Sequence, residues 1–346
     1  MPEEYNRKDL LTTSGVEAKK SLNSDKKTDY SDLMDVPEVD SLKVVIITDN
    51  YYDSLAPDAP NIKRYRTTPG KSIHAEHGIS FYIETEIDGM TCGMMFDFGV
   101  DPAGMINNME LLEIDLSRTK AFGLSHGHFD HWGGLLKILK HNKLKIRRNT
   151  PLYTGKEAFF RRFSIRPSES EPTDIGRLNK REIEELGILN IIEVNEPIEI
   201  FRGLYLTGNI ERVTSYENGA PNLLVKRGDE LERDFFEGEQ AAICNVKNRG
   251  LVVITGCAHV GIINTVLYSQ KITGRKIHAV IGGFHLVNAT SETIDRTLAD
   301  MKKICPDHIV PAHCTGFYAA SLFAKEMHEQ FIMSTAGTEY LFSSLL

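Results

Sequence analysis

Cysteine is scarce in this sequence of 346 residues: there are five, and no two of them are spaced as Cys-x-x-Cys. An odd number of cysteines in a chain of this length does not make a disulfide scaffold. The N-terminal segment has neither the basic stretch nor the apolar stretch of a secretory signal. We therefore expect a cytoplasmic protein whose cysteines are free or bound to metal.

The sequence also lacks long apolar runs and blocks of positive charge. No apolar stretch approaches the roughly 20 residues that a membrane-spanning helix needs. Lys and Arg number 40 and Asp and Glu 48, so the formal net charge is −8, which argues against a nucleic-acid partner. We expect a small-molecule substrate, no nucleic acid and no membrane, and leave a homo-oligomer open.

The composition that remains, 41% hydrophobic and 25% charged, is that of a globular enzyme. Residues 1–41 are polar and predict an N-terminal extension, and residues 42–346 predict one domain. Short β-branched runs alternate with helical patterns in that domain, which indicates an α/β fold. Residues 155–163 predict a helix and residues 164–181 a long loop, so we expect a lid or insertion at about 155–185.

Residues 125–131, Ser-His-Gly-His-Phe-Asp-His, are the most informative segment. Four potential metal ligands, His126, His128, Asp130 and His131, fall within six residues between an apolar strand and an apolar helix. In extended backbone, residues i and i+2 point to the same side, so His126 and His128 can bind one ion while the other two turn toward a second. Imidazole and carboxylate ligands suit Zn²⁺, Mn²⁺ or Fe²⁺, and the sequence leaves open whether one or two ions bind.

Further histidines stand just beyond short apolar runs with strand character, at His259, His285 and His313. Ends of strands are where α/β enzymes hold catalytic groups on a rigid scaffold. We therefore expect these segments to meet the 125–131 segment at one edge of the fold.

The pattern His-X-His-X-Asp-His resembles the signature of the metallo-β-lactamase superfamily. Several further segments resemble one subfamily, the metal-dependent hydrolases similar to dihydropterin–ribofuranosylaminobenzene-phosphate synthase. These are Glu-His-Gly-Ile-Ser at 76–80, Phe-Asp-Phe-Gly at 96–99, Thr-Gly-Cys-Ala-His at 255–259, Gly-Gly-Phe-His-Leu at 282–286 and Pro-Ala-His-Cys-Thr-Gly at 311–316. The resemblance implies a four-layer αββα sandwich with the metal site at the edge of the two sheets.

The resemblance also implies roles for single residues. His126, His128, Asp130, His131 and His313 match the family's metal ligands, and Asp97 matches an aspartate that orients ligand histidines from behind. The sequence departs from the family pattern in two places. It has no histidine between His141 and His259, so His259 is the candidate for the missing ligand. Cys257 stands where relatives have a bridging aspartate, and whether it binds metal stays open.

The ligand set implies hydrolysis by a metal-activated water, with Asp130 orienting the water and accepting its proton. His285 is a candidate proton donor, ligand or substrate contact. Glu76, His77, Arg212 and Thr315 are candidates for binding substrate, and the alternative for each is a structural role. Arg161 and Arg162 are expected on a solvated face.

We therefore expect a metal-dependent hydrolase, or a related transferase, that acts on an ester, a phosphoester or a phosphoribosyl compound. The alternatives are a non-catalytic metal-binding module and a nuclease of the same fold. The diiron flavoprotein branch of the superfamily is disfavoured, because it has glutamate where this sequence has His128.

Overall fold

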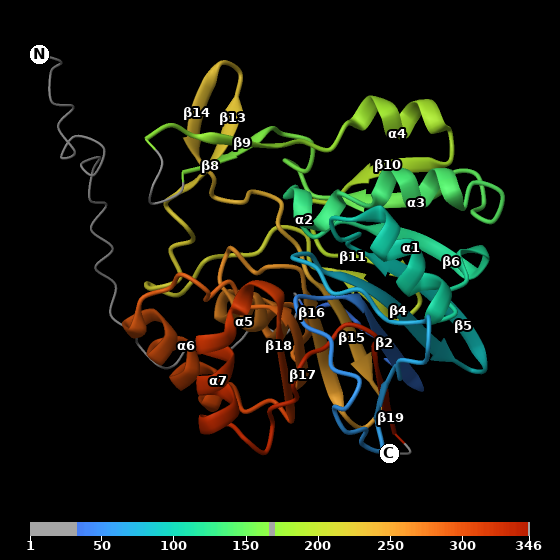
Figure 1. Cartoon of the computed structure of the whole chain (residues 1–346). Helices are drawn as coiled ribbons and strands as arrows, with labels where there is room; N and C mark the ends of the chain where they lie inside the picture. Colours follow the sequence, from blue (N-terminus) through green and yellow to red (C-terminus); the bar gives the residue numbers. More distant parts are fainter. Residues whose placement is uncertain (1–32, 166–169, 345–346) are drawn as a thin grey trace, which may run out of the picture. The chain divides into compact units, whose positions relative to one another are not determined.

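Two large sheets packed face to face form the centre of the protein (Figure 1). The computed structural model describes residues 33–165 and 170–344, and the chain forms one compact unit from Met34 onward. The first sheet contains, in spatial order, β10 (Leu189–Glu193), β7 (Thr150–Thr154), β6 (Thr119–Gly123), β5 (Met90–Phe96), β4 (Ser80–Ile87), β2 (Ser41–Thr48), β19 (Thr338–Ser343) and β3 (Ile62–Arg64).

The second sheet contains β11 (Ile198–Phe201), β12 (Leu204–Leu206), β15 (Ala242–Val246), β16 (Gly250–Thr255), β17 (Ile277–Gly283) and β18 (His308–Ala312), and β1 (Glu38–Val39) also pairs with β15. Apolar side chains from the facing sides of both sheets form one buried cluster, which includes Ile46, Phe81, Phe96, Val252 and Ile281. This cluster joins the two sheets into a sandwich.

Helices cover the outer face of each sheet (Figure 1). The first sheet is covered by α1 (Pro102–Leu111), α3 (Leu135–His141) and α4 (Lys180–Leu186), and the second by α5 (Ile262–Thr273), α6 (Ser291–Ile304) and α7 (Phe317–Glu326). Three shorter helical pieces are η2 (Leu116–Arg118), α2 (Phe129–Trp132) and η3 (His313–Thr315). The predicted αββα order of layers is confirmed. No helix within the described ranges is long and apolar enough to cross a membrane.

A small third sheet stands at the top of Figure 1, outside the sandwich. Its strands are β14 (Glu230–Arg233), β13 (Leu223–Arg227), β8 (Arg162–Ser164) and β9 (Thr173–Gly176). The helix predicted over 155–163 is therefore wrong: this stretch is a set of turns followed by β8. The predicted loop contains β9 and the start of α4, and its residues 166–169 lie outside the described residues. A lid role for 155–185 stays a prediction.

The domain also begins earlier than the sequence indicated. Val36 and Val39 are fully buried, and β1 adds to the second sheet beside β15. The boundary predicted at residue 42 is thus too late. Two isolated valines in a polar segment do not make the alternating apolar pattern that indicates a strand. Residues 1–32 of the predicted extension lie outside the described residues.

The strand directions decide where the chemistry gathers. β5 and β6 are parallel in the first sheet, and β16, β17 and β18 are parallel in the second. β15 is antiparallel to β16, so the residues that precede β15 lie at the same edge as the residues that follow β16. Segments far apart in the sequence therefore converge at one edge of the sandwich.

Candidate metal centre

All seven predicted metal ligands gather at this edge, in two adjoining groups. His126, His128, Asp130 and His131 follow β6, Cys257 and His259 follow β16, and His313 follows β18. Within each group, the potential ligand atoms lie within 4.8 Å of one another. The imidazole rings of His126 and His131, one from each group, have centroids 4.1 Å apart, so the groups touch.

The first group consists of His126, His128 and His259, and we call it the three-histidine group. All three side chains are buried, and His126 Nε2 lies 3.1 Å from His259 Nε2. His128 Nε2 is buried without a hydrogen-bond partner among the described residues. Burial is the main cause that holds the pKa of His126 and of His259 well below the ordinary value, and the neighbouring histidines lower it further because protonated rings so close together would repel one another. Three neutral imidazoles that converge without sharing protons are suited to one divalent ion.

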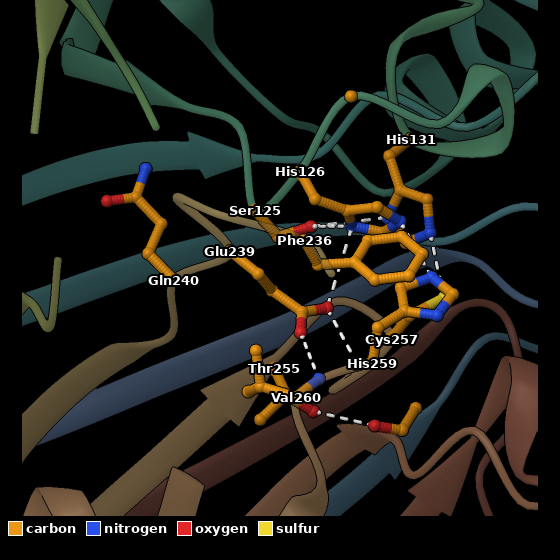
Figure 2. A network of polar contacts seen from close by, with 12 residues as sticks. Ser125, His126, His131, Phe236, Glu239, Gln240, Thr255, Cys257, His259 and Val260 are labelled. Carbon is orange, nitrogen blue, oxygen red and sulfur yellow. Dashed lines mark hydrogen bonds and ion pairs between the residues drawn. The ribbon is translucent and has the colours of Figure 1, made fainter. Parts of the chain in front are cut away.

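Three residues that the sequence analysis missed hold this group in place (Figure 2). The buried carboxylate of Glu239 accepts the backbone N–H of His259 at 2.9 Å and that of Val260 at 2.7 Å. The ring of Phe236 stacks on the His259 ring, with centroids 3.7 Å apart and an interplanar angle of 4°. The Ser125 hydroxyl lies 3.0 Å from His126 Nδ1. These contacts fix the orientations of His126 and His259 before any ion binds.

The second group consists of Asp130, His131, Cys257 and His313, and we call it the mixed group. Asp130 Oδ2 lies 3.1 Å from His313 Nε2, and Cys257 Sγ lies 3.1 Å from His131 Nε2. Burial raises the pKa of the Cys257 thiol, so a cation is needed to hold the thiolate form there. The group offers one carboxylate, two imidazoles and one thiol, a set that accommodates Zn²⁺ or Fe²⁺.

Buried carboxylates support the mixed group from behind. Asp97 Oδ2 accepts from His131 Nδ1 at 2.7 Å and from the Ser125 hydroxyl at 2.7 Å, while its Oδ1 accepts the Ser125 backbone N–H. Asp97 thus orients a ligand histidine as the resemblance implies. His313 is held by two residues that the sequence analysis missed: Asp49 Oδ1 accepts its backbone N–H at 2.9 Å, and Asn50 Oδ1 lies 3.2 Å from its Nδ1.

The turns at this edge are tightly packed and hold several residues in unusual backbone conformations. Four residues at this edge other than glycine have positive φ angles: Asp97 (59°), Ala258 (55°), His285 (47°) and His313 (48°). A Cβ at Gly256 would collide with the Ser125 hydroxyl. Strained backbone of this kind persists where the surrounding structure fixes it, and it concentrates at functional sites.

Comparison with known proteins identifies the family. The matching family model, described as the metallo-beta-lactamase superfamily, covers residues 80–204. A protein of Methanocaldococcus jannaschii named 7,8-dihydropterin-6-methyl-4-(beta-D-ribofuranosyl)-aminobenzene-5'-phosphate synthase is 31% identical over 309 residues, which are 88% of this chain and 98% of that protein. This chain belongs to the metallo-β-lactamase superfamily.

Two further proteins are similar to this chain. An uncharacterised protein of the same organism is 30% identical over 256 residues, 73% of this chain and 89% of that protein. A crystal structure described as a metal-dependent hydrolase of the β-lactamase superfamily superposes with a TM-score of 0.68 at 25% identity, and covers 88% of this chain and 100% of its own. The superfamily uses divalent metal ions, and both ligand groups contain the donors that such ions need.

Among the predicted substrate contacts, His77 lies at the metal centre with an exposed side chain, and its ring centroid is 5.0 Å from that of His313. Its side chain is 66% exposed, and its Nε2 lies 3.7 Å from Asp130 Oδ2. The Glu76 carboxylate instead accepts the backbone N–H groups of Val100 and Asp101.

Arg212 and Thr315 are also engaged within the protein. The guanidinium of Arg212 donates to three backbone carbonyls, those of Glu217, Phe235 and Val260. Thr315 is buried, and its hydroxyl accepts the Phe284 backbone N–H at 3.0 Å. These contacts favour a structural role for Glu76, Arg212 and Thr315.

His285 lies at the metal centre. Its ring centroid is 4.0 Å from that of His259, and a third set of potential ligands joins it to Cys257 and Cys314. Cys314 was not among the predicted ligands, because a cysteine next to a ligand histidine carries no signal of its own.

Proposed function

We propose that this protein is a metal-dependent hydrolase, or a transferase with related chemistry, that acts on an ester, a phosphoester or a phosphoribosyl-type small molecule. The observation that carries the proposal is the contact between the three-histidine group and the mixed group at one sheet edge. The two groups would hold one or two divalent ions, from Zn²⁺, Mn²⁺ and Fe²⁺, and an ion bound there would lower the pKa of a bound water toward neutrality and polarise the bond to be cleaved.

The residues of the chain have separate tasks in this reaction. Asp130 belongs to the mixed group and lies beside the exposed His77, so its carboxylate is placed to orient a water and to accept its proton. His285 stands beside His259, where it can donate a proton to the leaving group. His77, at the exposed side of Asp130, is placed to contact the substrate.

The substrate class rests on chemistry and on one relative. The relative named as a synthase has a ribofuranosyl 5'-phosphate in the name of its compound, which supports a phosphorylated sugar or a similar small molecule. The net charge of −8 disfavours a nucleic acid. All five cysteines are free, which supports a reducing compartment such as the cytoplasm.

The test is turnover by protein that has been stripped with a chelator and reloaded with Zn²⁺, Mn²⁺ or Fe²⁺. The substrates are bis(p-nitrophenyl) phosphate and a γ-lactone. We expect cleavage of at least one of them only after reloading, and we expect Asp130→Asn to lower kcat by about 10²- to 10⁴-fold. His141→Gln, which changes an exposed histidine outside the centre, is the matched control.

Two other outcomes would replace the proposal. Tight binding of two ions without turnover of either substrate would favour the non-catalytic metal-binding module. Cleavage of RNA or DNA with a steep dependence on salt would favour the nuclease.

A further inference from the structure

A third set of potential ligands lies beside the two groups described above. It consists of Cys257, His285 and Cys314, whose ligand atoms lie within 4.8 Å of one another, and we call it the two-thiol group. The three residues follow β16, β17 and β18, which are adjacent and parallel. Their meeting is thus a direct result of the sheet order.

The two-thiol group is tightly built. Cys314 is buried, its Sγ contacts the Cys257 carbonyl at 3.5 Å, and a Cβ at Gly283 would come within 2.6 Å of it. The Cys314 thiol therefore packs closely against Gly283 and the Cys257 carbonyl. The backbone of His285 has a φ angle of 47°, in the left-handed region that favours glycine. A residue other than glycine keeps this conformation only where the surrounding structure fixes it.

His285 also carries an unexplained polar atom. Its Nδ1 is buried and has no hydrogen-bond partner in the described part of the chain. Buried polar atoms in folded proteins nearly always have a partner, so an unpartnered one calls for a proton donor, a water or an ion that the protein atoms do not supply. Two thiols next to this imidazole favour the ion.

We propose that Cys257, His285 and Cys314 bind a soft divalent ion, Zn²⁺ or Fe²⁺, at a position of their own. Two thiolates and one imidazole are the protein ligands of one known class of catalytic zinc site, in which the fourth position stays open. The inference rests on the metal dependence of the proposed function but not on its reaction.

Cys257 belongs to both the mixed group and the two-thiol group, and this makes the position of an ion depend on its hardness. The carboxylate and imidazoles of the mixed group suit Mn²⁺, whereas thiolates suit Zn²⁺ and bind Mn²⁺ poorly. A soft ion is therefore drawn toward Cys314 and His285, and a hard ion toward Asp130 and His313.

Cobalt substitution tests the proposal in the full-length protein without any substrate. Co²⁺ bound to thiolate absorbs in the near ultraviolet, and the absorption rises with the number of thiolate bonds. We expect Cys314→Ser to lower this absorption at saturation by roughly half, since one of two thiolates is lost, and His285→Gln to weaken Co²⁺ binding at least tenfold. Cys244→Ser, which changes a buried cysteine in β15 away from the centre, should leave the absorption unchanged.

Full absorption and unchanged affinity in Cys314→Ser would overturn the proposal, because Cys257 would then be the sole thiolate ligand. If that variant does not fold, crystals of the unaltered protein grown with Zn²⁺ decide the matter. An anomalous peak about 2.3 Å from Cys314 Sγ is expected, and zinc only at the three-histidine and mixed groups contradicts the proposal. A two-thiolate signal in a protein that hydrolyses nothing would refute the proposed function alone.

Discussion

The guanidinium of Arg162 and the carboxylate of Asp234 form a buried ion pair, with Arg162 Nε 2.8 Å from Asp234 Oδ2. Arg162 Nη1 also contacts the carbonyl of Gly127, between the two first ligand histidines, at 3.3 Å. Asp234 Oδ1 accepts the backbone N–H of Phe236 at 2.7 Å. The pair therefore connects the small third sheet to the segment that carries His126 and His128, and to Phe236, whose ring stacks on His259.

Breaking this pair should destabilise the protein strongly. Asp234→Asn leaves the Arg162 guanidinium buried without a counter-charge, and we expect a loss of about 3–5 kcal/mol in the free energy of unfolding. Denaturant unfolding of the metal-free protein measures it. The control is Asp174→Asn, since Asp174 pairs with the exposed Arg161 and such surface pairs contribute about 1 kcal/mol or less. An equal loss of unfolding free energy in the two variants would show that the Arg162–Asp234 pair contributes no more to stability than an exposed ion pair.

Phe236 should tune the affinity of the three-histidine group for metal. Phe236→Leu keeps an apolar side chain but removes the ring stacked on His259. Aromatic pairs contribute about 0.5–1.5 kcal/mol beyond their burial, so we expect Zn²⁺ affinity to fall about 2- to 10-fold. Competition with a chromophoric chelator measures the affinity. Phe235→Leu, at a 51% exposed neighbour, is the control, and an equal fall there would assign the effect to the segment rather than to stacking.

The strands that carry the ligands could be predicted from sequence, because each is a short apolar run that ends in a polar segment. The short apolar runs expected before His259, His285 and His313 are strands: β16 (Gly250–Thr255), β17 (Ile277–Gly283) and β18 (His308–Ala312). The sequence signal was weaker elsewhere. β19 at Thr338–Ser343 was missed, because its buried and half-exposed residues alternate over only six positions.

Arg162 shows why a local pattern can mislead. The sequence analysis placed Arg161 and Arg162 together on a solvated face of a helix. In the structure the chain enters strand β8 at Arg162, and neighbouring side chains of extended backbone point to opposite sides. Arg161 is accordingly exposed, and Arg162 is among the largest fully buried side chains.

Glu239 and Asn50 illustrate a second limit. Each contacts the centre only because its strand lies in the correct place and direction in a sheet. Glu239 precedes β15, which is antiparallel to β16, and Asn50 follows β2. Pairing between distant strands is not encoded in residue spacing, so neither residue carried a signal in the sequence.

Metal binding by the mixed group should strengthen as the pH rises from 7 to 9. Burial alone would lower the pKa of His313, but its hydrogen bond to Asp130 and the acidic groups nearby outweigh burial and raise that pKa to about 9. In the metal-free protein His313 is thus protonated at pH 7, and an ion must displace that proton. Each displaced proton changes the affinity by about tenfold per pH unit, in favour of the ion at higher pH.

The three-histidine group is the internal control for this pH dependence. Burial holds the pKa values of its histidines well below the ordinary value, so those imidazoles are already neutral at pH 7. Isothermal titration in two buffers of different ionisation enthalpy counts the protons released with each ion. Proton release with the first and the second ion alike, or with neither, would contradict this assignment.

The identity of residue 257 should set the metal preference of the mixed group. Cys257 Sγ lies 3.1 Å from His131 Nε2, and the preceding Gly256 is packed so closely that a Cβ there would collide with the Ser125 hydroxyl. A thiolate at residue 257 favours Zn²⁺ or Fe²⁺ over Mn²⁺. Cys257→Asp replaces it with a hard carboxylate, and we expect two ions to remain bound while the preference shifts toward Mn²⁺. Cys257→Ser, which has neither a thiolate nor a carboxylate, should lose the second ion, whereas His259→Ala should lose the first. Metal content after dialysis against equal Zn²⁺ and Mn²⁺ measures all three variants. If Cys257→Ser and Cys257→Asp both keep the unaltered protein's content and preference, Cys257 packs as a small apolar residue, and the mixed group binds its ion through Asp130, His131 and His313 alone.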